Sequence, residues 1–238
     1  EMLMLQGKYD EAKEQYDIHY KLNKNKNDYY TKRAKEQSTN VTKKIKKVGE
    51  SVGLEVKHIN DLDINSMYAE YAPCQYNDSI FFFAGVRPLD AKLADTSFIY
   101  ANYLTRVIQA TRRNDSTWSN VKVVSSLIDP NAHVNNLSFT RDGKTAYFSK
   151  CFGYNCSIYK ADFDPKFLDF SNVTKLPAPI NMAQTSNTTP QIAYTSQGDY
   201  LFFASNRKGT KGGYDIWYAS IDSSGNIGSV QNCGKNVN

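Results

Sequence analysis

The residues best suited to binding chemistry lie in one glycine- and lysine-rich run near the carboxyl end. Gly209-Thr-Lys-Gly-Gly213 follows directly after Arg207 and Lys208. A phosphate-binding loop needs a longer spacing that ends in Gly-Lys-Ser/Thr, and this run lacks it. We therefore expect a hairpin loop whose cations Arg207, Lys208 and Lys211 could hold an acidic partner. The competing interpretation is a solvated loop tip without a ligand.

The sequence shows no converging set of catalytic groups. None of the three histidines, His19, His58 and His133, is accompanied by a Gly-x-Ser-x-Gly or His-Glu-x-x-His motif. Asp142 and Asp215 have short polar side chains that suit hydrogen bonds to turn backbone. We therefore predict that the chain is not an enzyme and that it needs no cofactor.

One acidic run begins like a calcium loop but does not complete it. Asp61-Leu-Asp-Ile-Asn65 is followed by Ser66 where the loop requires Gly, and by Ala72 where it requires Glu. The cysteines form no Cys-x-x-Cys pair, and no His lies at ligand spacing from them, which argues against zinc. We therefore predict no metal site.

Two of the four cysteines are placed to pair. Cys151 and Cys156 flank Phe-Gly-Tyr-Asn, which reads as the tip of a hairpin. A disulfide can close such a tip when the two Cβ atoms face each other. The bond would suit an oxidising compartment such as a periplasm. The alternative is two free, unconnected thiols.

A strand pattern occurs three times after about residue 51. Each copy has a short apolar run, then a loop or turn, then a second run that ends in Ala. A turn precedes the first run: Asn77-Asp78 in the first copy, Asp-Gly in the second and Gly-Asp in the third. The paired runs are Ile80–Ala84 with Ser97–Ala101, Thr145–Ser149 with Ser157–Ala161, and Tyr200–Ser205 with Asp215–Ala219.

Repeats of this length with about four short strands are typical of β-propeller blades. We therefore expect a mainly β fold: a partial propeller of about three four-stranded blades over residues 51–238. A connector motif that precedes the third copy recurs from Cys233, which suggests that a fourth blade starts there. Three blades are too few for a closed ring, so further sequence or a second chain would have to complete it.

Residues 1–50 are predicted to form a short helical segment. Tyr9, Ala12 and Tyr16 fall on one face, and Gly7 suits a turn between two helices. Asp28 is a candidate N-cap for a second long helix that would end at Gly49. This arrangement resembles a tetratricopeptide unit, in which the three face residues pack inward.

The net charge of +5 is concentrated in this helical segment. A basic arm could contact nucleic acid, but no motif of a nucleic-acid-binding fold accompanies it, so we expect a solvated helix surface. No apolar run approaches the length of a membrane span.

The repeat motifs also resemble a known family. Arg141-Asp-Gly-Lys-Thr-Ala-Tyr-Phe-Ser149, Tyr200–Arg207 and Gly212–Tyr218 resemble TolB-type, WD-like propeller repeats. Together with the tetratricopeptide-like start and Ile64–Pro73, they resemble Bacteroidetes OmpA-family proteins, in particular the PorE-like components of the type IX secretion system.

This resemblance implies a periplasmic, outer-membrane-associated interaction protein of a secretion or gliding-motility complex, with secretion-complex subunits as protein partners. In that family peptidoglycan is bound by an OmpA-like domain, which this sequence does not contain. The alternative is a propeller of a TolB-like or peptidase protein that gates or binds a peptide or glycan ligand.

Overall fold

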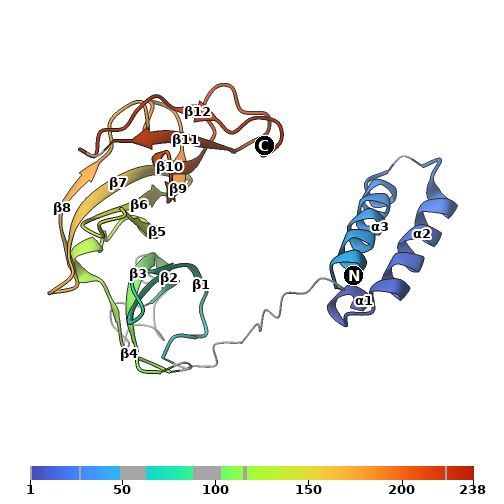
Figure 1. The fold of residues 1–238 in the computed structure, drawn as a ribbon, viewed down its shortest axis with the longest axis horizontal. Coiled ribbons are helices and arrows are strands. Elements are labelled where there is room, and N and C mark those ends of the chain that lie inside the picture. Colours follow the sequence, from blue (N-terminus) through green and yellow to red (C-terminus); the bar gives the residue numbers. More distant parts are fainter. Residues whose placement is uncertain (1, 27, 49–62, 88–102, 115–116, 223) are drawn as a thin grey trace. The chain divides into compact units, whose positions relative to one another are not determined.

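The chain contains a helical unit and a β unit. The computed structural model describes residues 2–26, 28–48, 63–87, 103–114, 117–222 and 224–238. Contacts divide the chain into two compact units, residues 1–58 and residues 59–238 (Figure 1).

The helical unit is built from α1 (Met2–Leu5), α2 (Tyr9–Asn23) and α3 (Tyr29–Val48). Gly7 joins α1 to α2 with a φ of 73°, which costs glycine little. Asp28 caps α3, because its Oδ1 accepts a hydrogen bond of 2.8 Å from the Thr31 amide. The predicted helix end at Gly49 lies outside the described residues. No helix in the described ranges is long and apolar enough to cross a membrane.

The β unit confirms the mainly β prediction. It contains three antiparallel four-stranded sheets, ordered β1-β2-β3-β4, β5-β6-β7-β8 and β12-β11-β10-β9 (Figure 1). A short 3-10 helix, Ser125–Leu127, precedes the second sheet. The strands are β1 (Glu70–Gln75), β2 (Ile80–Val86), β3 (Thr105–Arg112), β4 (Trp118–Val123), β5 (His133–Phe139), β6 (Thr145–Phe152), β7 (Asn155–Asp164), β8 (Asp169–Lys175), β9 (Asn187–Thr195), β10 (Gly198–Ser205), β11 (Asp215–Ile221) and β12 (Gln231–Asn232).

One strand of the first repeat was placed wrongly from the sequence. The third strand of the first sheet is β3, which pairs with β2 through Ala84 and Val107. The predicted run Ser97–Ala101 lies outside the described residues. The apolar pattern of β3 is interrupted by Arg106 and Gln109, yet both side chains are buried. Tertiary packing therefore overrides the polar signal.

The first strand of each sheet contains the same backbone irregularity. Ala72, Asn136 and Thr189 adopt φ values of 51°, 57° and 52°. Each residue lies where the register of its strand shifts against the second strand. A left-handed, non-glycine residue is unfavourable unless the surrounding structure imposes it. Its recurrence shows that β1, β5 and β9 are equivalent strands of one repeated unit.

Aromatic and aliphatic side chains fill the spaces between neighbouring sheets. Phe82 of the first sheet packs with Phe139, Phe163 and Phe170 of the second. Tyr147 of the second sheet packs in a cluster with Leu201 and other side chains of the third. Each interface is therefore a closed apolar layer.

The third sheet has a face that no described residue covers in this way. Phe202 occupies the repeat position of Phe82 and Tyr147, which are 0% and 2% exposed, but it is only half-buried. It stacks on Tyr218 of its own sheet, with ring centroids 5.6 Å apart. Tyr200 meets Tyr218 edge-on, at 6.0 Å. The described side chains thus leave an aromatic face partly open.

Truncation at these equivalent positions should have unequal effects. We expect Tyr147→Ala to lower the free energy of unfolding by about 3–5 kcal/mol, because it leaves a cavity between two sheets. Phe202→Ala should cost about 1 kcal/mol, because its ring is already partly hydrated. Urea unfolding followed by tryptophan fluorescence reports the β unit, since both tryptophans, Trp118 and Trp217, lie in it. Equal losses would contradict the assignment of the open face.

Hydrogen bonds join neighbouring sheets near the first residues of their strands. The Thr105 amide donates to Nδ1 of His133 across the first interface, at 3.0 Å. At the equivalent place in the second interface, the Cys156 amide donates to Oγ of Ser186, at 2.9 Å. The pKa of His133 is lowered by its burial and by the charge of Arg106. Because Nδ1 of His133 accepts this hydrogen bond from Thr105, the bond requires the neutral imidazole, and the lowered pKa favours that form.

The hydrogen bond to His133 should make the free energy of unfolding depend on pH. The unfolded histidine titrates near pH 6.5, and the folded pKa is lower, so the unfolded chain binds more protons between the two values. Stability should therefore fall as the pH drops below about 6.5. Asparagine at this position keeps an acceptor that cannot titrate, so His133→Asn should remove this part of the pH dependence. Urea midpoints between pH 7.5 and 5 measure it.

His19→Asn is the matched control, because His19 is exposed in the helical unit. If the midpoints of His133→Asn and of the wild type decline in parallel over this pH range, His133 is not the titrating group.

Candidate functional site

A hollow of about 550 Å³ opens where the first strands of the three sheets end. Its wall is formed by the ends of β1 and β5, the second half of β9, and the turns that follow β1 and β5. It combines aromatic rings with amide, hydroxyl and charged groups. The lining residues are Pro73, Cys74, Gln75, Tyr76, Asn77, Ser138, Phe139, Thr140, Arg141, Asp142, Gly143, Gln191, Ile192 and Tyr194.

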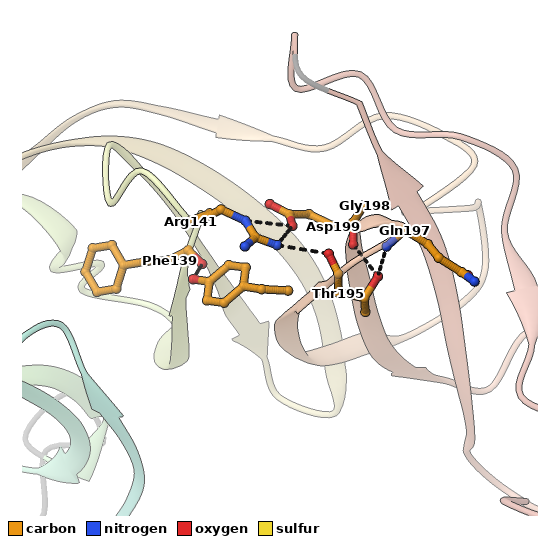
Figure 2. A network of polar contacts seen from close by, with 7 residues as sticks. Phe139, Arg141, Thr195, Gln197, Gly198 and Asp199 are labelled. Carbon is orange, nitrogen blue, oxygen red and sulfur yellow. Dashed lines mark hydrogen bonds and ion pairs between the residues drawn. The ribbon is translucent and has the colours of Figure 1, made fainter.

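Arg141 dominates the polar side of this hollow. It lies in the β5–β6 turn and reaches the third sheet, where Nη2 donates to Oδ1 of Asp199 at 2.7 Å and to the Thr195 carbonyl at 3.2 Å (Figure 2). The guanidinium carbon lies 5.1 Å from the centroid of the Tyr194 ring. Tyr194 in turn donates to the Phe139 carbonyl, at 2.6 Å. These contacts join two sheets and hold a half-exposed cation at the rim.

The turn that carries Arg141 is closed by its own side chains. Oδ1 of Asp142 accepts from the Thr140 hydroxyl at 2.7 Å and from the Lys144 amide at 3.1 Å. These hydrogen bonds lower the pKa of Asp142, so its carboxylate stays ionised. Gly143 has a φ of 68°, and a Cβ there would lie 2.8 Å from the hydroxyl oxygen of Tyr76. Asp142 and Gly143 therefore shape the turn, as the sequence suggested for Asp142.

The thiol in the hollow is protonated at neutral pH. Burial raises the pKa of Cys74 to about 11, which leaves little of the nucleophilic thiolate. The described residues include no group of three or more His, Cys, Asp and Glu side chains that could hold a metal ion. The hollow offers hydrogen-bonding groups, aromatic rings, the Asp142 carboxylate and the partly neutralised charge of Arg141.

Arg207 was predicted to be an exposed loop-tip residue, and the structure corrects this. The residue is only 4% exposed. Its Nη1 donates to the Pro179 carbonyl at 3.0 Å, and its Nη2 donates to Oδ1 of Asn187 at 2.9 Å. The guanidinium also lies 5.3 Å from the centroid of the Trp217 ring. Arg207 therefore locks the connector before β9 to the end of β10.

The same lock exists in the first sheet. Arg87 follows β2 as Arg207 follows β10, and its Nη2 donates to the Ile64 carbonyl. Nη2 of Arg207 donates to Ile180, which stands at the same place in its connector. The sequence signal was therefore an Ile-Asn connector coupled to an arginine after the second strand. The lysine-rich run around Arg207 masks this signal in the sequence.

Lys208 and Lys211 lie where the sequence placed them, on the exposed loop between β10 and β11. The Lys211 amide donates to Oδ2 of the buried Asp215, at 3.0 Å. This loop is at the opposite end of β10 from the hollow, because β10 begins beside Arg141 and ends beside Arg207. The predicted cations and the Arg141 hollow are therefore separate sites.

The structure contains a disulfide between Cys151 and Cys156, the pair that the sequence singled out. The two residues face each other across the β6–β7 hairpin. Cys74 and Cys233 are free.

No family model matches the chain, and no curated protein matches it. Solved structures with some similarity include TolB from Acinetobacter baumannii, at 17% identity and a TM-score of 0.42, covering 73% of this chain and 34% of that one. The GH43 endo-arabinanase from Bacillus licheniformis has 18% identity and a TM-score of 0.40, and the match covers 70% of this chain and 61% of that one. Zg3597, a family 117 glycoside hydrolase of Zobellia galactanivorans, has 13% identity and a TM-score of 0.44, and the match covers 77% of this chain and 60% of that one.

The chain therefore covers less than two thirds of each of these proteins. At these identities and TM-scores, the likeness assigns no catalytic residue or ligand to this chain.

The prediction that the chain is not an enzyme is contradicted by these comparisons. Several of the similar structures are glycoside hydrolases. The sequence lacks motifs of serine and metal-dependent hydrolases, but this absence says nothing about enzymes that use other residues on such a fold.

Replacement of the buried arginine should destabilise the β unit, whereas its exposed neighbour should be tolerated. We expect Arg207→Met to lower the free energy of unfolding by about 2–4 kcal/mol, because carbonyls of the connector lose a charged donor while buried. Lys208→Ala should change it by less than about 0.5 kcal/mol. Urea unfolding of both variants decides this, and an unaffected Arg207→Met would show that Arg207 is not a lock.

Proposed function

We propose that the β unit is a partial β-propeller that contributes about three blades to the ring. Equivalent left-handed residues in β1, β5 and β9, and the aromatic residues at one repeat position, support a repeated blade. The half-buried ring of Phe202 supports a further sheet that packs on the third one, as the third packs on Tyr147. A tetratricopeptide-like role for the helical unit belongs to the same proposal.

We propose that this propeller segment is an interaction module of an outer-membrane-associated secretion or gliding-motility complex in the periplasm. The observation that carries the binding role is the hollow at Arg141, which turns and strand ends from all three sheets build jointly. A rigid scaffold with polar turns at its ends is suited to recognition. The Cys151–Cys156 disulfide supports an oxidising compartment. The resemblance to PorE-like components, which rests on the repeats together with the tetratricopeptide-like start and Ile64–Pro73, supports the proposal of a role in type IX secretion.

A peptide or glycan ligand for the hollow is the second candidate. Its volume lies within the range of small-ligand sites, about 300–1,000 Å³. Tyr76 and Tyr194 contribute rings to the lining of the hollow, and Asn77 and Gln191 contribute amide side chains to the same lining as Arg141. Such a set can stack on a sugar or hold a peptide backbone.

Affinity purification of the tagged protein from its native cells tests the assignment. We expect outer-membrane secretion components to be recovered with the wild-type chain. Recovery of none of them would contradict the secretion role. A glycan and peptide array, probed with the wild-type protein and with Arg141→Ala, tests the second candidate. Saturable binding that the substitution weakens would place a ligand in the hollow. Uniformly flat responses would exclude glycans.

A further inference from the structure

The β6–β7 hairpin ends in an exposed aromatic tip. Tyr154 is 97% exposed and Phe152 is 49% exposed. Between them, Gly153 has a φ of 58°, which the tight turn requires. The Cys151–Cys156 disulfide closes the base of this turn. Two large rings are therefore held in water on a covalently constrained loop.

A buried serine holds the lysine-containing loop beside this tip. Oγ of Ser186 donates to the Tyr154 carbonyl at 3.1 Å and accepts from the Cys156 amide at 2.9 Å. The Ser186 amide donates to Oδ1 of Asn206, at 2.8 Å. Asn206 begins the segment that continues through the buried Arg207 to Lys208. The aromatic tip and the β10–β11 loop thus belong to one surface with a fixed geometry.

This surface has an excess of positive charge. Nearby, Lys150 pairs with Asp129, at 3.5 Å. Asp215 is buried and accepts from the Lys211 amide and from Nδ2 of Asn232. Within the described ranges, the side chains of Lys208 and Lys211 form no ion pair, and both are exposed. Two cations are therefore available to a partner beside the two rings.

We propose that these four residues, named here the hairpin-tip surface (Phe152, Tyr154, Lys208 and Lys211), bind an acidic protein segment that carries an aromatic or large aliphatic side chain. Exposed Tyr and Phe gain most when a partner side chain removes them from water. The disulfide and the Ser186 bridge reduce the conformational entropy that binding would otherwise cost. The lysines attract and orient carboxylates of the partner.

This inference rests on the proposed interaction role and names a surface and a partner chemistry for it. It differs from the Arg141 hollow, which lies at the other end of the strands. A polar ligand in the hollow would leave the hairpin-tip surface free.

Fluorescence anisotropy with synthetic nine-residue peptides tests it. The probe alternates Glu and Phe, and the comparison peptides alternate Glu with Ala and Lys with Phe. We expect the Glu/Phe peptide to bind the full wild-type chain more tightly than either comparison peptide, and to weaken as salt is raised. The variant Lys208→Glu/Lys211→Glu/Tyr154→Ala should bind it at least about tenfold more weakly.

The matched control is Lys144→Glu/Lys166→Glu/Phe167→Ala, which makes the same charge change and removes an exposed ring at the opposite end of the hairpins. It should bind within about twofold of wild type. Unchanged urea midpoints verify that both variants fold.

Equal binding of all three peptides, or equal losses in both variants, would overturn the hairpin-tip surface. The outcome is separate from the affinity purification. Peptide binding without recovery of secretion components would leave the surface standing and remove the secretion role, whereas the reverse would keep the role and reject this surface.

Discussion

The β unit depends on aromatic packing between its sheets. A four-stranded sheet has two faces, and an isolated sheet of this size cannot hide both from water. Phe82 and Tyr147 solve this problem by packing against the neighbouring sheet. Phe139 and Phe163 of the second sheet meet the Phe82 ring at an angle, and Tyr147 packs in a cluster with side chains of the third sheet. The stacking of sheets is thus a requirement of burial, and the partly open face at Phe202 is where the same requirement is unmet by described residues.

Packing the sheets together creates a second demand, because backbone groups at their edges lose contact with water. Side chains satisfy these backbone groups with hydrogen bonds to amides or carbonyls of another segment, as His133, Ser186 and Asn181 do. Arg207 does so with a charged group, which is stable when buried only because several oxygens surround it. Arg207 is therefore buried because backbone carbonyls need its donors, whereas the neighbouring Lys208 and Lys211 stay exposed.

The two proposed binding surfaces are formed by side chains that stay exposed after burial and hydrogen bonding are satisfied. At one end of the strands, Arg141 spans two sheets and still presents part of its guanidinium to a hollow. At the other end, the tip of the β6–β7 hairpin and the lysines of the next loop are exposed although their backbones are tied together. Both sites are turns on a rigid repeated scaffold, which is where binding residues concentrate.

Local patterns in the sequence determined much of the architecture. The helices around Gly7 and Asp28, the apolar strands β2, β6 and β10, and the facing cysteines of the β6–β7 hairpin were all predictable, because short-range periodicity and turn chemistry govern them. Only the tertiary structure decided the position of β3 and the role of Arg207. In β3, Arg106 and Gln109 look exposed by residue type, yet neighbouring segments cover them. Arg207 reads as a loop cation until the connector carbonyls, more than twenty residues away in the chain, are seen to surround it. Burial of a polar group is set by distant partners, and no local pattern contains them.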